Sequence, residues 1–161
     1  MKNRKYLFLG VVLWFVWGCS NVDYTQQYSA YIVLKTPHLK YADMGFIYEN
    51  SQRLKVEIYS NGQVVTALKI GKDSVCMGTM SCLSKKAFTR RFLSLEYPEE
   101  MIGQIFRGEA IFGGRNKIQK RNGFTQKCIK HGKYHIEYTV FNKQILFRDT
   151  INKILIKVIR Q

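Results

Sequence analysis

The sequence predicts an α+β fold in which two short helices form a lid over a strongly curved antiparallel sheet, that is, an open or half β-barrel. Three observations lead to this prediction. Apolar residues recur at every second position in both halves of the chain, the segment between them has helical spacing, and Asn61-Gly62 marks a tight hairpin. Strands followed by helices and then by strands are typical of helices packed on a single sheet.

Five strands are expected before the helices, at residues 28–35, 43–49, 53–59, 64–70 and 74–77. The third alternates cleanly, with Leu54, Val56 and Ile58 on one face. The fourth repeats this alternation and places Val64, Thr66, Leu68 and Ile70 on one side. Asn61-Gly62 lies between these two strands, and both residue types tolerate the positive φ of a two-residue turn.

Two helices are expected next. Ser84 is a suitable N-cap for a helix over 85–93, and Phe88 and Phe92 would face inward at a spacing of four residues. Tyr97-Pro98-Glu99-Glu100 is typical of a helix start, because proline suits the first turn and acids suit the positive end of the dipole. An apolar stripe follows, and Gly108 is expected to end the helix. Such a stripe usually covers a sheet.

Alternation returns after Gly123 and predicts four more strands, at 124–130, 133–141, 143–148 and 152–160. His131-Gly132 joins the first two of them. The last strand would turn Ile154, Ile156 and Val158 toward the core.

The N-terminus has the layout of a signal peptide. Three basic residues precede an apolar run of twelve residues, 6–17, which spans only about 18 Å and is too short for a ~30 Å hydrocarbon core. The run ends in Val16-Trp17-Gly18-Cys19, which resembles a bacterial lipobox. Residues 1–18 would then be removed, Cys19 would be lipidated, 19–27 would form a lipidated tether, and 28–161 a single domain. The alternative is that Cys19 is an ordinary thiol near the end of an uncleaved anchor.

Compartment and charge together restrict the partners. Ser20 follows the cysteine, which by analogy with enteric bacteria implies lipid anchorage at the periplasmic face of the outer membrane. The net charge is +15, and without residues 1–18 it is +12. An exported chain does not meet genomic DNA, so nucleic acid is excluded and the anions it meets are those of the envelope. Residues 110–135 contain no acidic residue, and this stretch is either a membrane-facing patch or a solvated face.

The cysteines and histidines predict a disulfide and no metal site. Cys76 and Cys82 are separated by five residues that include a glycine, which suits a short bridged turn in an oxidising compartment. His131 and His135 are too few for a zinc site. No cofactor is expected. The chain contains no nucleophile-elbow, phosphate-loop or zinc-protease motif, and Cys128 and His131 would point to opposite faces, so the protein is not expected to be an enzyme.

The order of elements resembles the LolA/LolB superfamily, and within it the LolB-like outer-membrane receptors. The likeness lies in the lipobox at Cys19, the hairpin 54–70, the helical stretch 97–111 and the terminal strands 133–160. The resemblance implies a half-closed barrel with helices as a lid over an apolar cavity that receives lipoprotein acyl chains. In that family the protruding hairpin carries an exposed leucine just before the glycine. Asn61 stands there in this chain, so Tyr59 and Asn61 are the membrane-facing candidates.

The functional prediction is a lipid-anchored protein that binds acyl chains or lipoproteins and helps place them in the outer membrane. A monomer is expected, with the membrane, an acyl-chain or lipoprotein ligand and a periplasmic carrier protein as its partners. The alternative is a structural envelope lipoprotein whose filled barrel docks a protein or polymer. The candidates for lining the cavity are Phe46, Val56, Ile58, Leu68, Phe88, Phe92, Met101, Ile105, Phe106, Tyr134, Ile136, Tyr138 and Ile156. Plain core packing is the competing role for each of them.

Overall fold

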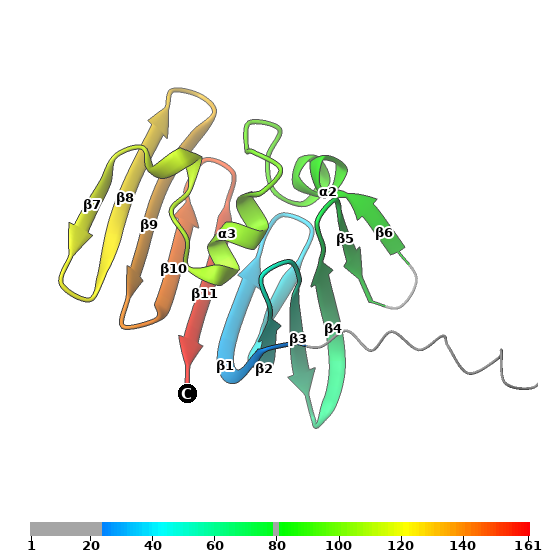
Figure 1. Cartoon of the computed structure of the whole chain (residues 1–161). Helices are drawn as coiled ribbons and strands as arrows, with labels where there is room; N and C mark the ends of the chain where they lie inside the picture. The colour runs from blue at the N-terminus through cyan, green and yellow to red at the C-terminus, as the bar shows by residue number, and fades with distance from the viewer. Residues whose placement is uncertain (1–23, 79–80) are drawn as a thin grey trace, which may run out of the picture.

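The computed structural model describes residues 24–78 and 81–161, and in them eleven strands form one antiparallel sheet (Figure 1). The strand order is β6-β5-β4-β3-β2-β1-β11-β10-β9-β8-β7. The first and last strands pair at the centre, with Ala30 opposite Arg160. Strands β6 and β7 are the two ends of this order, so the sheet is not closed into a barrel. The predicted antiparallel sheet with two short helices is confirmed.

The elements follow one another in this order: β1 (Gln26–Lys35), β2 (Lys40–Glu49), β3 (Leu54–Ser60), β4 (Gln63–Ile70), β5 (Ser74–Met77), β6 (Ser81–Ser84), α2 (Lys85–Phe92), α3 (Met101–Arg107), the 3-10 turn η2 (Phe112–Gly114), β7 (Lys117–Lys120), β8 (Gly123–Lys130), β9 (Tyr134–Phe141), β10 (Gln144–Asp149) and β11 (Ile154–Arg160).

The hairpin between β3 and β4 forms as predicted. Asn61 and Gly62 have φ angles of 51° and 77°, the left-handed values that a two-residue turn needs. A register shift between Ile58 and Tyr59 places Tyr59 opposite Val64. Val64, predicted to lie on the same side as Thr66, therefore shares the face of Tyr59 instead and is about half exposed, so this part of the prediction is wrong.

Helix α2 begins and ends close to its predicted bounds. The side-chain oxygen of Ser84 accepts a hydrogen bond from the Ala87 amide at 3.2 Å, which is the expected N-cap. Phe88 and Phe92 are buried on one side of the helix, with ring centroids 4.9 Å apart. Leu93 serves as the C-cap rather than as the last helical residue.

Helix α3 begins later than the sequence pattern predicts. Pro98 and Glu99 form a turn before the helix, the Pro98 carbonyl accepts from the Met101 amide, and Glu100 is the N-cap. Gly108 ends the helix in the left-handed conformation, as predicted. The apolar stripe of α3 is fully buried, and it consists of Met101, Ile102, Ile105 and Phe106.

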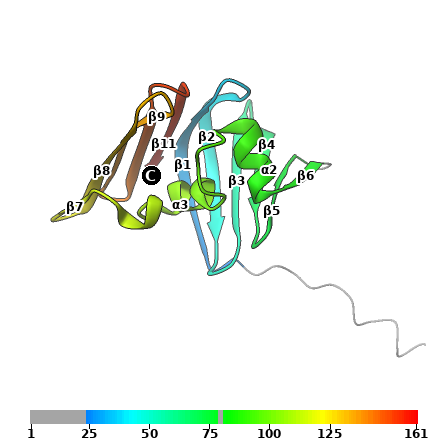
Figure 2. The ribbon, with the colours of Figure 1, turned by 90° about the horizontal axis from the view of Figure 1, so that it is seen from above.

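Both helices lie on the same face of the sheet, which we call the apolar face (Figures 1 and 2). Alternate residues of the central strands point to it, so that Ile32 pairs with Val158 and Val158 pairs with Ile145 across three strands. These side chains and the helix stripes form one buried cluster. The opposite side of the sheet, the outer face, carries most of the charged side chains of the strands.

Three features were not predicted. The edge strands β6 and β7 were missed, as was the η2 turn. Strand β1 also begins at Gln26, because Gln26 and Gln27 pair with Glu49 and Tyr48 of β2. The last two residues of the predicted tether therefore belong to the sheet. The signal peptide and Cys19 lie outside the described residues.

The predicted disulfide between Cys76 and Cys82 is present and joins β5 to the edge strand β6. The two residues lie directly opposite each other in this strand pair. Only six positions separate them, so the chain-entropy gain is about 2 kcal/mol. We expect the double variant Cys76→Ser/Cys82→Ser to lose about that much free energy of unfolding. Hydrogen exchange should accelerate in 81–84 and stay unchanged in β1, and loss of protection throughout the sheet would contradict this local role.

Candidate functional site

The predicted cavity residues gather, with one exception, on the apolar face beneath the helices. Twelve of the thirteen belong to the single buried cluster, and none of the twelve is more than 8% exposed. They are Val56, Ile58, Leu68, Phe88, Phe92, Met101, Ile105, Phe106, Tyr134, Ile136, Tyr138 and Ile156. Period-2 and helical spacing thus identified one continuous apolar surface, to which both helices and four strands contribute these twelve residues.

Phe46 is the exception, and its assignment to the cavity is wrong. Its neighbour Ile47 points to the apolar face, so Phe46 points to the outer face. There its ring lies 5.7 Å from the ring of Tyr59 and 6.3 Å from that of Tyr48. Phe46 and Ile47 are both apolar, so the sequence did not show which of them faces the core. Phe46 is apolar because it packs in the aromatic cluster on the outer face.

The side chains of the apolar cluster are buried. Four hollows open along the surface of the described chain, two of them beside α3, and their volumes range from about 230 to 670 Å³. None of the thirteen predicted lining residues borders any of these four. The helices therefore lie directly on the sheet.

Four polar side-chain atoms are buried without a hydrogen-bond partner among the described residues: the hydroxyls of Tyr28 and Tyr138, the side-chain oxygen of Gln104 and Nε of Arg160. Burial raises the pKa of Tyr138 well above its usual value, and the nearby Glu109 carboxylate adds to this. Burial also raises the pKa of Tyr28 to about 12, although Arg160 opposes the shift. A buried polar group without a hydrogen-bond partner costs free energy. These unpaired groups therefore make the packing between the helices and the sheet less stable than it would be with every polar group paired.

The segment between the helices is fixed to the sheet by a buried carboxylate. Asp149, 1% exposed, accepts hydrogen bonds from the Tyr97 hydroxyl, from the Asn152 side chain at 2.6 Å, and from the backbone amides of Ile151 and His135. Burial alone would raise the pKa of Asp149, but these hydrogen bonds lower it below its usual value. Burial and the bond to Asp149 raise the pKa of Tyr97, which therefore stays protonated as the donor.

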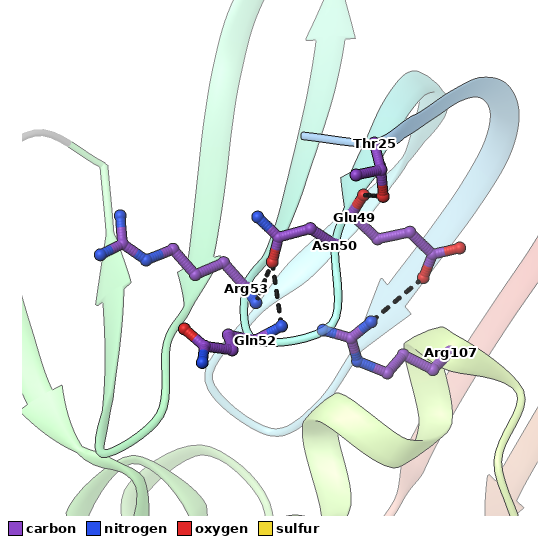
Figure 3. A network of polar contacts seen from close by, with 6 residues as sticks. All are labelled: Thr25, Glu49, Asn50, Gln52, Arg53 and Arg107. Atoms are coloured by element: carbon purple, nitrogen blue, oxygen red, sulfur yellow. Dashed lines mark hydrogen bonds and ion pairs between the residues drawn. The ribbon is translucent and has the colours of Figure 1, made fainter. Parts of the chain in front are cut away.

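Two ion pairs hold the helices, one between α3 and a strand end and one between the two helices. Arg107, the last residue of α3, lies 3.5 Å from the Glu49 carboxylate at the end of β2 (Figure 3). Lys85, at the start of α2, lies 2.5 Å from Glu100, the N-cap of α3, and the Lys85 side chain is largely buried. The Glu49 carbonyl also accepts from the Thr25 hydroxyl, so the entry to β1 is held at the same place.

The exposed apolar side chains at the tip of the β3–β4 hairpin are not the predicted membrane-facing residues. Tyr59 packs on Phe46 and donates to Glu57 at 3.1 Å, and Asn61 is an exposed polar residue. Val64 and Val65, by contrast, are 47% and 48% exposed just after the turn. Sequence alternation missed this pair because it placed Val64 on the same side as Thr66, Leu68 and Ile70.

Three further possibilities are a reactive cysteine, a metal site and a membrane-spanning helix. Cys128 is buried, its sulfur 3.8 Å from the Arg115 carbonyl, and burial raises the pKa of the thiol, which keeps it protonated and weakly nucleophilic. Across 24–78 and 81–161, no group of three or more metal-binding side chains is placed to hold an ion. No helix within these ranges is long and apolar enough to cross a membrane.

No protein-family model and no curated protein matches this chain. Its chemistry is therefore inferred from its own residues, which form a large apolar surface covered by two short helices.

Proposed function

We propose that the mature chain is a lipid-anchored protein of the outer membrane that binds acyl chains of lipids or lipoproteins against the apolar face, with α2 and α3 as a movable lid. The observation that carries the proposal is an unclosed eleven-stranded sheet whose apolar face is covered by helices of only eight and seven residues. The proposal agrees with the expectation from the LolA/LolB superfamily, a half-closed barrel with a helical lid. A periplasmic carrier protein would deliver the ligand.

A lid of this kind opens at modest cost. Helices shorter than about 12 residues are marginal by themselves in water, so α2 and α3 depend on the sheet for their stability. When they lift, the aliphatic and aromatic side chains beneath them become available, and an alkyl chain can replace the helix stripes at about 0.8 kcal/mol per buried CH₂. The same apolar area is then covered by ligand.

The unpaired polar atoms support this exchange. The hydroxyls of Tyr28 and Tyr138 have no acceptor among the residues that the structure describes. The ester and amide carbonyls next to acyl chains are acceptors of the right kind, and a ligand that supplied them would satisfy both donors. Ligand binding would thus remove a cost that the closed state carries.

Uptake of a fluorescent fatty acyl probe by residues 20–161 tests the proposal. We expect saturable fluorescence enhancement, and competition by palmitate. The variant Gly103→Ala should slow uptake about three- to fivefold, because alanine stabilises a helix interior by roughly 0.5–1 kcal/mol and its Cβ would meet only Ile70 at 3.7 Å. Stopped-flow fluorescence gives the rate.

Thr125→Val is the matched control. It favours the strand conformation in β8 on the outer face, away from the helices, and should leave the uptake rate unchanged. Uptake absent from a chain with a native circular-dichroism spectrum and cooperative unfolding would contradict the carrier function.

That outcome would favour the second candidate, a structural envelope lipoprotein with a filled core that docks a protein or polymer. The observation in its favour is that the apolar cluster is complete without a ligand and none of its twelve predicted residues borders the four surface hollows. Neither candidate uses covalent chemistry.

A further inference from the structure

A hollow of about 670 Å³, which we call the basic groove, lies where β3, β4 and β5 meet the turns at their ends. It is open to solvent, and we call its charged lining side chains the rim. Its lining residues are Tyr24, residues 52–55, residues 69–74 and Cys76. Leu54 and Ile70 also belong to the apolar cluster, and the other lining residues lie outside it.

The rim of the basic groove carries uncompensated positive charge. Arg53, Lys69 and Lys72 are exposed and form no ion pair within residues 24–78 and 81–161. Lys55 is already occupied, since its ammonium lies 3.1 Å from Glu57 and 4.0 Å from the ring centroid of Tyr48. Asp73 is the one carboxylate among the described lining residues. Three free cations against one acid make the groove attractive to an anion.

Hydrogen bonds fix the backbone turns next to Arg53, Lys69 and Lys72. The Asn50 side chain accepts from the amides of Gln52 and Arg53 at 3.0 and 2.7 Å, which closes the β2–β3 turn. Figure 3 shows the Arg53 guanidinium extending away from Arg107, so the Glu49–Arg107 pair does not compete for it. On the other side, the Gly71 amide donates to Ser74 at 2.8 Å and closes the β4–β5 turn.

The position of the groove relative to the chain's entry identifies the anion. Tyr24 lines the groove, and its ring lies 5.8 Å from that of Tyr48. Tyr24 lies five positions after Cys19, and a fully extended chain over five positions spans at most about 18 Å. If Cys19 carries the lipid anchor, the groove is held within that distance of the bilayer, where phospholipid phosphates are concentrated.

We propose that the basic groove binds the phosphate of an anionic phospholipid in the anchoring membrane, and so fixes how the domain is oriented on it. The proposal rests on the lipid anchorage proposed above and not on the acyl site. Binding in this orientation would turn the other end of β3, at the β3–β4 hairpin, away from the anchor point. The hairpin tip at Asn61 lies six residues along that strand from Lys55, roughly 20 Å.

Lysine acetylation of the mature chain in nanodiscs tests the proposal. One set of nanodiscs contains phosphatidylcholine alone, and the other contains phosphatidylcholine and phosphatidylglycerol at three to one. Mass spectrometry measures the acetylation rate of each lysine, and we expect Lys69 and Lys72 to react roughly fivefold more slowly when phosphatidylglycerol is present. Lys117 and Lys120, on the distant edge strand β7, should react equally in both.

Two variants of equal charge change complete the test. The first variant is Arg53→Gln/Lys69→Gln/Lys72→Gln. It should abolish the lipid-dependent protection of Lys55 against acetylation and of the 71–74 amides against hydrogen exchange. The second variant, Lys117→Gln/Lys120→Gln/Arg121→Gln, should preserve both. Equal acetylation of Lys69 and Lys72 in both nanodiscs would overturn the proposal. So would protection by free inorganic phosphate in phosphatidylcholine nanodiscs, since the ligand would then be soluble, or protection of Lys117 and Lys120 instead.

The anchor is measured separately, by the intact mass of the same sample. A chain without acyl groups at Cys19 would contradict the proposed anchorage, and the labelling would then use that chain with added phosphatidylglycerol vesicles. Protection in the vesicles would still support the groove, and its absence would overturn it.

Discussion

Replacing Asp149 with alanine is expected to lower the free energy of unfolding by about 3–5 kcal/mol. The carboxylate is 1% exposed and satisfies donors from the helix connection and from two strand ends. Alanine would leave the Tyr97 hydroxyl and the His135 amide buried without acceptors. It would also release the connection between α2 and α3 from the sheet. Urea unfolding followed by circular dichroism measures the loss.

Two milder substitutions separate the contributions. Tyr97→Phe removes one donor together with the need to satisfy it, so the loss should be about 1–2 kcal/mol. Asp149→Asn keeps one acceptor oxygen in place and should fall between the other two variants. A loss below 1 kcal/mol for Asp149→Ala would show that the buried network does not hold the helix connection in place.

The same carboxylate predicts a pH dependence. Its folded-state pKa is lowered by hydrogen bonds, so protonation favours the unfolded chain. The stabilisation is therefore complete above the unfolded pKa of about 3.9 and is lost as the pH falls toward the folded value. Wild-type stability should drop more steeply below about pH 4 than that of Asp149→Asn, which has no group to titrate at this position.

The sequence predicts the fold best where one face of an element is buried. Strand β3 alternates without exception, and α2 has both a cap and an inward phenylalanine pair, so their predicted bounds agree with the structure within one residue. Strand β7 was missed because all four of its residues are exposed, which removes the alternation that marks a strand. Strand β6 has only four residues and depends on β5 and the disulfide.

The site is predictable only in part, for a related reason. Spacing reveals which side chains point to the apolar face, and twelve of thirteen assignments agree with the buried cluster. Spacing does not reveal whether helices or a ligand fill the space above them. Asp149 was missed because its partner Tyr97 is 52 positions away, although the amides of Ile151 and Asn152 bonded to its side chain form a local turn that a sequence could suggest.

Gly45→Ala is the other substitution expected to have a large effect, because β2 and β3 come very close at this residue. A Cβ at position 45 would lie 2.1 Å from the Glu57 carbonyl oxygen and 2.8 Å from the Ile32 side chain. The carbonyl belongs to a paired strand, so relief requires a shift of the backbone between Gly45 and its partner Ile58. We expect a loss of about 3 kcal/mol, measured by urea unfolding.

Gly103→Ala is the matched control for the size of the added group, and its sign should be opposite. The same methyl group placed in α3 meets only Ile70 at an ordinary contact distance and gains about 0.5–1 kcal/mol of helix stability. Equal effects of the two variants would contradict the close approach at Gly45. If the approach is real, hydrogen exchange in Gly45→Ala should accelerate first in β2 and β3, since the strain is confined to the strand pair where alanine does not fit.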